Sequence, residues 1–151
     1  MVGPRTSPLA KDSLENNMLA IADTGYLVAL VRKDDHHHGW ATGLAGQLEL
    51  PLLTCEAVLA ETAFHLASSA YVLAMLRRGA IRVAFDCASQ LEHLYKLAES
   101  YSDWNCDLAD LCLIRMSELY PRHTVITVDE DFRVYRRNKR EAIPLLTPPK
   151  K

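Results

Sequence analysis

The chain has 151 residues and a formal charge of −2, from 17 lysine and arginine residues against 19 aspartate and glutamate residues. This length predicts one domain with a single hydrophobic core. The near balance of charge excludes an overall basic surface, so any nucleic-acid site must be local. No apolar run approaches the roughly 18 residues of a membrane-spanning helix. Residues 1–17 lack a signal-peptide pattern, so we expect a cytoplasmic protein, without a membrane partner, whose residues 1–17 form a disordered leader.

Short apolar runs alternate with helical patterns along the rest of the chain. Through residue 85 the predicted elements are a strand (18–23), a helix (24–33), a helix (39–47), a strand (50–54), one long or two consecutive helices (55–79) and a strand (80–85). Beyond residue 85 they are two helices (89–101 and 107–120), a strand (123–129) and a short strand (143–146). Strands that alternate with helices indicate βαβ units, so we expect a mostly parallel sheet covered by helices on both faces.

The tripeptide Asp23-Thr24-Gly25 is also the one that carries the catalytic carboxylate of aspartic proteases. A retroviral-type protease subunit is nearly all strand, whereas helical periodicity dominates this chain. Asp23 stands directly after a predicted buried strand instead. The pattern therefore favours another role for this carboxylate.

Four carboxylates interrupt stretches that are otherwise apolar, and they are Asp23, Glu61, Asp110 and Asp129. An isolated buried carboxylate takes up a proton unless a cation or hydrogen-bond donors compensate its charge. In open parallel sheets the functional crevice lies at the carboxyl ends of the strands, where Asp23 and Asp129 fall. We expect Glu61 and Asp110 to reach this crevice from the first turns of neighbouring helices. Because all four ligands are oxygen atoms, a shared hard cation such as Mg²⁺ or Mn²⁺ is favoured over zinc.

Two further acids stand near these four. Asp107 lies one helical turn before Asp110 on the same face, and Asp131 lies just beyond the acid that ends the last long strand. Each also has an ordinary structural interpretation, Asp107 as a helix N-cap and Asp131 as the N-cap of a helix over 132–138. Glu61 is likewise compatible with a helix-surface residue. Structural networks also gather carboxylates, and this alternative stays open for the whole set.

Four segments in this order resemble the PIN-domain family, and within it the VapC-like ribonuclease toxins of type II toxin–antitoxin systems. They are ADTGYLVAL for the first acid, AVLAETAFHL for the second, DLADLCLIRMSELY for the third and VITVDEDFRVYRR for the last. The match runs from about Met18 to Leu146, which is nearly the whole chain. Each segment alone is a weak signal, and the four in order are a specific one. The family often has serine at the position of Gly25.

The resemblance implies a three-layer α/β/α sandwich with a mostly parallel four- or five-stranded sheet over residues 18–147, followed by a tail over 148–151. It implies an endoribonuclease that hydrolyses RNA phosphodiester bonds with Mg²⁺ or Mn²⁺. The implied catalytic metal ligands are Asp23, Glu61, Asp110 and Asp129, with Asp107 and Asp131 as further members, and the family varies at the position of Asp131. As a toxin, the chain is expected to form a homodimer and to be inhibited by a small antitoxin protein. The apolar excess over 63–76 fits such an interface.

Basic residues follow the last acids in the stretch FRVYRRNKR, residues 132–140. We expect Arg133, and next Arg136, to hold the RNA backbone beside the metal. A solvated charged turn is an equally compatible interpretation of this stretch.

Histidines and cysteines are the other residues with ligand chemistry. Three consecutive histidines, 36–38, cannot all face one ion, so we expect a polar helix start capped by Asp34 or Asp35. His65 stands four residues after Glu61, and we expect it to pack rather than to bind metal. The four cysteines lack CxxC spacing and lie in apolar stretches, which predicts buried free thiols in a reducing compartment.

Three other functions are compatible with parts of this pattern. A PIN nuclease of RNA processing would lack an antitoxin in the neighbouring reading frame. A non-catalytic PIN-like module would bind RNA or protein without cutting. A receiver or phosphatase domain would need a lysine downstream of its nucleophilic aspartate, and the segment TVITVDEDF has no equivalent of it.

Overall fold

A computed structural model describes residues 17–150. Through residue 83 the elements are β1 (Ala20–Ala22), α2 (Thr24–Val31), α3 (His38–Ala45), β2 (Leu52–Thr54), α4 (Glu56–Leu66), α5 (Ser69–Arg77) and β3 (Ile81–Val83). They continue with η1 (Ala88–Gln90), α6 (Leu91–Ser100), α7 (Leu108–Leu119), β4 (Thr124–Ile126), η2 (Glu130–Arg133), β5 (Arg136–Arg137), β6 (Glu141–Ala142) and β7 (Leu145–Leu146). The predicted leader lies outside the described residues except for residue 17.

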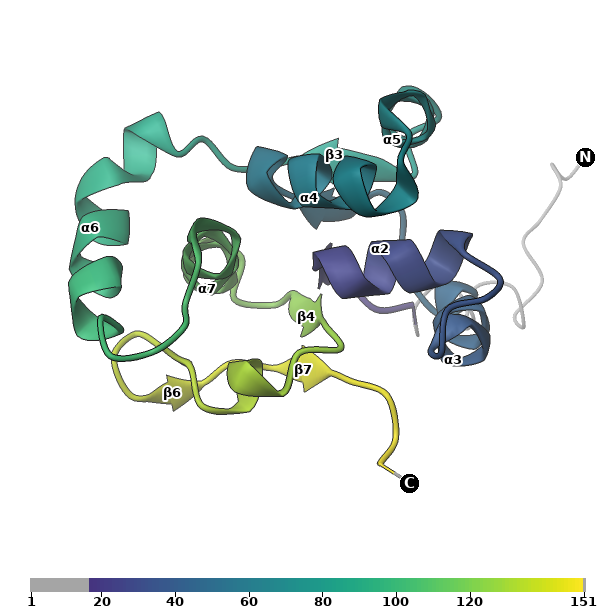
Figure 1. The fold of residues 1–151 in the computed structure, drawn as a ribbon. Coiled ribbons are helices and arrows are strands. Elements are labelled where there is room, and N and C mark those ends of the chain that lie inside the picture. The colour runs from purple at the N-terminus through teal and green to yellow at the C-terminus, as the bar shows by residue number, and fades with distance from the viewer. Residues whose placement is uncertain (1–16, 151) are drawn as a thin grey trace, which may run out of the picture.

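The central sheet has five strands in the order β3-β2-β1-β4-β7, and each neighbouring pair is parallel. Figure 1 shows α7, with α6 outside it, on one side of this sheet and α2 with α3 on the other. The predicted α/β/α architecture with a mostly parallel sheet is therefore confirmed. In the register of β1 and β4, Ala22 lies opposite Ile126, so both strands end at the same level.

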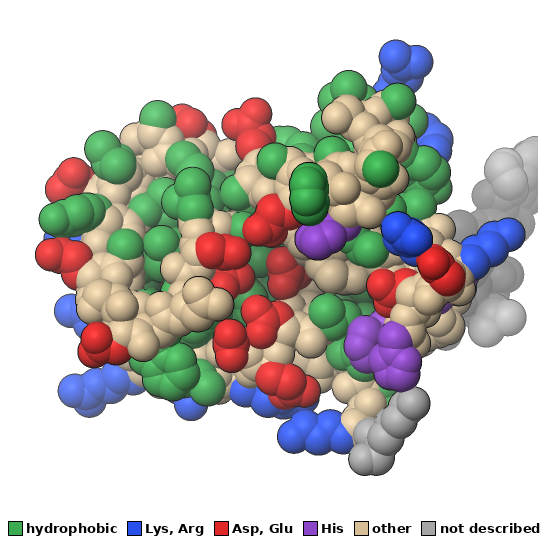
Figure 2. All heavy atoms as spheres, viewed as in Figure 1, with side chains coloured by type: hydrophobic (Ala, Val, Ile, Leu, Met, Phe, Trp, Pro, Cys, Tyr) green, Lys and Arg blue, Asp and Glu red, His purple; other side chains and the backbone are tan. Residues whose placement is uncertain are grey.

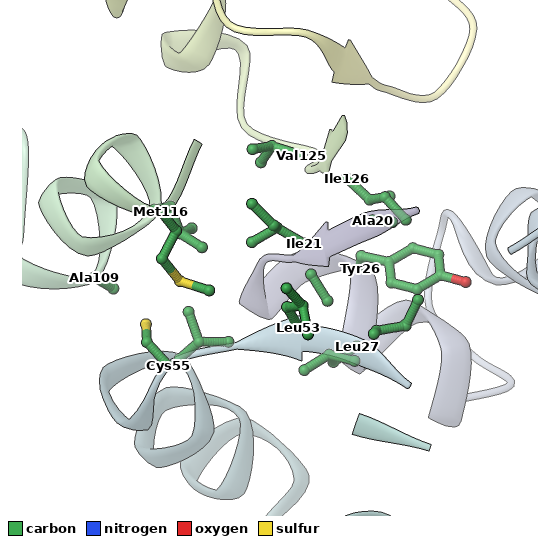
Figure 3. Packing of buried hydrophobic residues seen from close by; sticks show 14 of the residues in the cluster. Ala20, Ile21, Tyr26, Leu27, Leu53, Cys55, Ala109, Met116, Val125 and Ile126 are labelled. Atoms are coloured by element: carbon green, nitrogen blue, oxygen red, sulfur yellow. The ribbon is translucent and has the colours of Figure 1, made fainter. Parts of the chain in front are cut away.

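The core lies between the sheet and its helices. Ile21 and Val125, which are partners on β1 and β4, are fully buried. Figure 3 shows Met116 of α7 packed on one side of these strands and Leu27 of α2 on the other. Full burial of each such side chain contributes about 1.5–3 kcal/mol, which holds the strand ends and the helices beside them in place. Among residues 17–150, no helix is long and apolar enough to cross a membrane.

The segment 55–79 forms two helices rather than one. Ala67 adopts a left-handed conformation (φ 53°) at the end of α4. Ser68 then begins α5, because its hydroxyl accepts a hydrogen bond from the backbone N–H of Tyr71 (3.0 Å). The chain turns between these helices, so that α5 does not continue the direction of α4 (Figure 1).

The helix over 132–138, considered as an alternative role for Asp131, does not form. The short 3-10 helix η2 ends at Arg133, and an antiparallel hairpin of β5 and β6 follows it. The buried guanidinium of Arg137 donates to the carbonyl of Ser117 in α7 (2.9 Å) and forms an ion pair with Glu141 (2.8 Å). This contact with α7 outweighs the local helical pattern, and two-residue strands leave almost no periodic signal in a sequence.

Candidate metal centre

The six acids singled out from the sequence line one cleft of about 390 Å³ at the carboxyl-terminal edge of the sheet, together with Asp35. Asp23 follows β1, Asp129 follows β4, and Asp131 lies in η2. Glu61 belongs to α4 and Asp110 to α7, and Asp107 is the N-cap of α7. Figure 2 shows acidic side chains gathered across the middle of this face, with lysine and arginine side chains toward its edges. The structure therefore brings together all six acids that were singled out from the sequence.

The strand order explains why the cleft lies here. The chain runs from β1 outward to β2 and β3, and then crosses back to β4 on the other side of β1. In an open parallel sheet, such a reversal leaves a crevice between the two central strands, outside their carboxyl ends. Asp23 and Asp129 both lie in this crevice.

Asp23 stands where β1 ends and α2 begins, and only 7% of it is exposed. One carboxylate oxygen accepts a hydrogen bond from the backbone N–H of Thr24 (2.7 Å), which is the N-cap contact of α2. The other oxygen accepts from the hydroxyl of Thr127 (2.6 Å), just beyond the neighbouring strand β4. These two bonds hold the Asp23 carboxylate in one orientation.

Glu61 faces the cleft from the second turn of α4. The first turn was expected, but α4 begins at Glu56, five residues before Glu61, which places this acid one turn later. The Glu61 carboxylate accepts a hydrogen bond from the Thr24 hydroxyl (2.9 Å). Thr24 therefore connects the carboxylates of Asp23 and Glu61, since its backbone contacts one and its side chain the other.

Asp110 lies in the first turn of α7 as predicted, and it is 8% exposed. Asp107 is the N-cap of this helix, with its carboxylate accepting from the backbone N–H of Asp110 (2.9 Å). The buried Tyr135 hydroxyl donates to the Asp110 carboxylate (3.2 Å). Asp107 therefore has the structural role considered from the sequence and still lines the cleft.

Asp129 rather than Asp131 is the N-cap of the 3-10 helix η2, which corrects the structural role considered for Asp131. The Asp129 carboxylate accepts from the backbone N–H of Asp131 (2.9 Å). Its own backbone N–H donates to the Thr127 hydroxyl (2.9 Å), and that hydroxyl donates in turn to Asp23. Thr127 thus links the acids that follow the two central strands.

Burial and mutual repulsion disfavour the charged forms of two of the acids. Desolvation raises the pKa of Asp23 from 3.8 to about 6, and the charge of Asp129 raises it too. Desolvation also raises the pKa of Asp110 from 3.8 to about 7, with Asp107 adding repulsion. A carboxylate has such a pKa when no neighbouring cation compensates its charge.

The sequence over residues 20–138 matches the model of the PIN domain. The chain belongs to the PIN-domain family. The crystal structure of VapC20 from Mycobacterium tuberculosis, described as a sarcin–ricin loop cleaving toxin, is similar to this PIN domain, with a TM-score of 0.66 and 20% sequence identity. The similarity covers 76% of this chain and 93% of that chain. No curated protein matches the sequence.

The donors in the cleft of this PIN domain fit a hard divalent cation. Seven carboxylates line the same space, and no lysine or arginine of the described chain lines it. Within residues 17–150, no three His, Cys, Asp or Glu side chains converge closely enough to enclose an ion as they stand. Carboxylates without a compensating positive charge repel one another and remain apart. Oxygen ligands of this charge match the preferences of Mg²⁺ and Mn²⁺.

Among the other residues that line the cleft, four with carboxylate, imidazole or amide side chains were not predicted to lie there. Asp35, His37, His65 and Asn105 line the same cleft. His65 is exposed at this cleft, so the expectation that it packs is wrong. Its spacing of four residues from Glu61 was a signal for this position, whereas Asn105 lies in a connection without periodicity.

The histidine run begins a helix as expected, with a different cap. The helix α3 begins at His38 after His37 as N-cap, and the Asp35 carboxylate accepts from the backbone N–H of His37 (2.8 Å). Asp35 therefore orders the turn just before the helix. The nearby Asp34 forms an exposed ion pair with Arg32 instead (3.0 Å).

The two arginines predicted to hold RNA lie outside the lining of the cleft. The Arg133 side chain is exposed and contacts Glu130 (2.6 Å) and the Thr147 hydroxyl (2.8 Å). The Arg136 guanidinium donates to the carbonyls of Arg133 (2.8 Å) and Tyr135 (3.0 Å), so it folds back on its own loop. RNA contact by these arginines stays a prediction.

Gly25 packs so closely against Val128 that the structure has no space for a side chain at this position. A Cβ atom added at Gly25 would overlap the side chain of Val128, which leaves no room for the serine that the family often has. We expect Gly25→Ser to lower the free energy of unfolding by about 1–3 kcal/mol through overpacking. Urea unfolding measures this loss.

Two further variants separate the contact from a general effect of serine. Adding Val128→Ala to Gly25→Ser removes the overlapping methyl groups and is expected to restore part of the stability. Gly43→Ser, in α3 with open space around its Cβ position, is expected to have little effect. Equal losses for Gly25→Ser with and without Val128→Ala would contradict the explanation.

Proposed function

We propose that this PIN domain is a metal-dependent endoribonuclease that hydrolyses RNA phosphodiester bonds, and that it is the toxin of a toxin–antitoxin pair. The observation that carries the proposal is the cleft lined by seven carboxylates at the reversal of strand order. Family membership and the similarity to VapC20 support the same activity. We assign Asp23, Glu61, Asp110 and Asp129 as metal ligands, with Asp107 and Asp131 around them.

The chain itself supplies orientation rather than a nucleophile. Hydrolysis of a phosphodiester builds negative charge on the scissile phosphate. A bound Mg²⁺ or Mn²⁺ would stabilise this charge and lower the pKa of a bound water molecule. The hydrogen bonds from Thr24 and Thr127 position Asp23, and the Tyr135 hydroxyl positions Asp110. Such supporting contacts keep ligands in place while the substrate binds.

RNA must approach an acidic cleft, so its phosphates need positive charge from elsewhere. We assign the first contact outside the cleft to the exposed Arg133, with Arg136 next, because Arg133 ends η2, which begins just after Asp129, and Arg136 begins β5. VapC20 is described as cleaving the sarcin–ricin loop. A hairpin with that loop sequence therefore belongs in the first set of substrates, beside tRNA, rRNA and mRNA.

Cleavage of these RNAs by the purified protein with Mg²⁺ or Mn²⁺ tests the activity. We expect fragments with either metal, none with EDTA, and none from the double variant Asp23→Asn, Asp110→Asn. The variant Asp86→Asn is a matched control, because this acid is exposed and outside the cleft lining, and it should cut like the native chain. Cleavage that survives both EDTA and the double variant would contradict the proposal.

Two alternatives correspond to other outcomes. Folded protein that neither cuts any of the RNAs nor binds metal would be a non-catalytic PIN module. Cutting without an antitoxin gene beside the reading frame would instead identify a nuclease of RNA processing.

The proposal includes a homodimer and a small antitoxin protein. Phe64 of α4 is 80% exposed and Leu73 of α5 is 62% exposed, with Tyr71 also exposed on α5. Large apolar side chains at this density on two neighbouring helices are typical of interaction surfaces. We expect light scattering to show a dimer for the native chain and a monomer for Phe64→Asp. A native monomer would remove the dimer from the proposal.

A further inference from the structure

Three cysteines that do not line the acidic cleft come from separate elements. Cys55 is the N-cap of α4, Cys112 belongs to α7, and Cys87 lies in the connection between β3 and η1. The sulfur atoms of Cys87 and Cys112 are 3.5 Å apart. The proposed nuclease chemistry uses none of these three thiols.

The three thiols differ in their access to solvent. Cys55 and Cys112 are fully buried, whereas Cys87 is exposed. The prediction that all four cysteines are buried is therefore wrong for Cys87, and Cys106 is only partly buried. An exposed thiol beside a buried one is the arrangement in which an oxidant reaches the first sulfur and the second resolves the product.

We propose that Cys87 and Cys112 form an oxidation site for hydroperoxides, with a reversible disulfide as its product. The Cys87 thiolate attacks the peroxide, the O–O bond breaks, and a sulfenic acid forms on Cys87 while one water or alcohol leaves. The sulfur of Cys112 then attacks the sulfenic sulfur. The S–O bond breaks, and the hydroxide leaves as water with the Cys112 proton. Two thiols thus lose two electrons to one peroxide.

The geometry requires only a small movement for this second step. The sulfur atoms must close from 3.5 Å to the disulfide length of about 2.0 Å. Cys112 is held in the core by α7, while residues 84–86 before Cys87 belong to neither a helix nor a strand. We expect Cys87 to move toward Cys112, so that the disulfide forms without unfolding α7.

The disulfide would attach an outlying part of the molecule. Figure 1 shows the connection after β3 reaching across to η1 and α6, which lie outside α7. Leu94 is the one buried residue of α6, and Leu97 is only partly buried against the core, so few apolar contacts hold this helix. A bond between Cys87 and Cys112 ties the start of this segment to α7. Hydrogen exchange of the backbone in 84–100 is expected to slow on oxidation.

Mass spectrometry of the full reduced chain after treatment with hydrogen peroxide tests this site. We expect the intact mass to fall by two hydrogen atoms, and two of the four thiols to lose reactivity toward an alkylating agent. A peptide map without reductant should show Cys87 joined to Cys112, and dithiothreitol should reverse the change. The readout is independent of the proposed nuclease, because it needs neither RNA nor metal.

Variants that keep the core intact make the result decisive. Cys87→Ser changes an exposed side chain and is expected to abolish the disulfide. Cys106→Ser is the matched control, since this cysteine lies beside Tyr135 and away from the pair, and the disulfide should still form. Three results would overturn the proposal: a disulfide between Cys55 and Cys112, a disulfide between two chains, or a sulfinic acid on Cys87 without any disulfide.

Discussion

Asp110→Asn is expected to make the metal-free protein more stable and the nuclease inactive. The Asp110 carboxylate is buried, and desolvation together with repulsion from Asp107 and Asp23 raises its pKa to about 7. Its charged form is therefore destabilising in the folded protein at pH 8 without metal. Each factor of ten in proton affinity corresponds to about 1.4 kcal/mol, so we expect a gain of a few kcal/mol from the neutral amide. The same change removes a proposed metal ligand. Cleavage should therefore fall by more than about 100-fold, which is the largest loss typical of substituting a residue that only orients metal ligands.

Urea unfolding in EDTA at pH 8 and RNA cleavage in Mn²⁺ measure the two effects on the same preparation. The Tyr135 hydroxyl can still donate to the amide oxygen of the variant, so the local hydrogen bond is kept. Asp86→Asn, at an exposed position outside the cleft, should change neither quantity much. If Asp110→Asn lowered stability instead, Asp110 would be a structural residue and its assignment as a metal ligand would lose its basis.

The stability of the metal-free protein is expected to fall as the pH rises from about 4 to about 7. The pKa values of Asp23 and Asp110 are raised in the folded state, to about 6 and about 7, from the 3.8 of an exposed aspartate. Their protonated forms therefore stabilise the fold fully below pH 3.8, and this contribution is lost as the pH passes through the raised values. Mn²⁺ binds the deprotonated carboxylates, so its stabilising effect should grow over the same range.

Thermal unfolding between pH 5 and pH 8, with EDTA or with Mn²⁺, tests this linkage. The difference in melting temperature between the two conditions should widen as the pH increases for the native chain. In Asp23→Asn, Asp110→Asn the curve in EDTA should be flatter, because both perturbed carboxylates are gone. If the melting temperatures of the native chain in EDTA and in Mn²⁺ differed by the same amount at every pH, the metal would not bind at these acids.

The strand ends and the acids that follow them could be predicted because their signals are local. A carboxylate directly after a buried apolar strand is conspicuous in sequence, and parallel topology places such residues at one edge of the sheet. Asp23 and Asp129 lie there, and the periodic helix that begins after Asp107 brings Asp110 to the same cleft. The fold class follows from the same alternation of strand and helix.

Other parts of the site depend on contacts between distant segments, which periodicity does not reveal. Asn105 reaches the cleft from a connection, and His65 from a helix whose direction is set by its packing. The hairpin of β5 and β6 forms because Arg137 is buried against α7, and no spacing in residues 132–140 encodes that contact. The approach of Cys87 to Cys112 likewise results from the path of the chain between β3 and α6.

Calorimetric titration of Mn²⁺ into the metal-free protein, in two buffers of different ionisation enthalpy at pH 6.5, tests the central claim that these carboxylates share a divalent cation. We expect saturable binding to the native chain with release of protons, because Asp23 and Asp110 are partly protonated at this pH and must lose their protons to bind metal. Binding should be lost in Asp23→Asn, Asp110→Asn and kept in Asp86→Asn. Folded native protein that takes up no Mn²⁺, or that takes it up equally in the double variant, would contradict the claim.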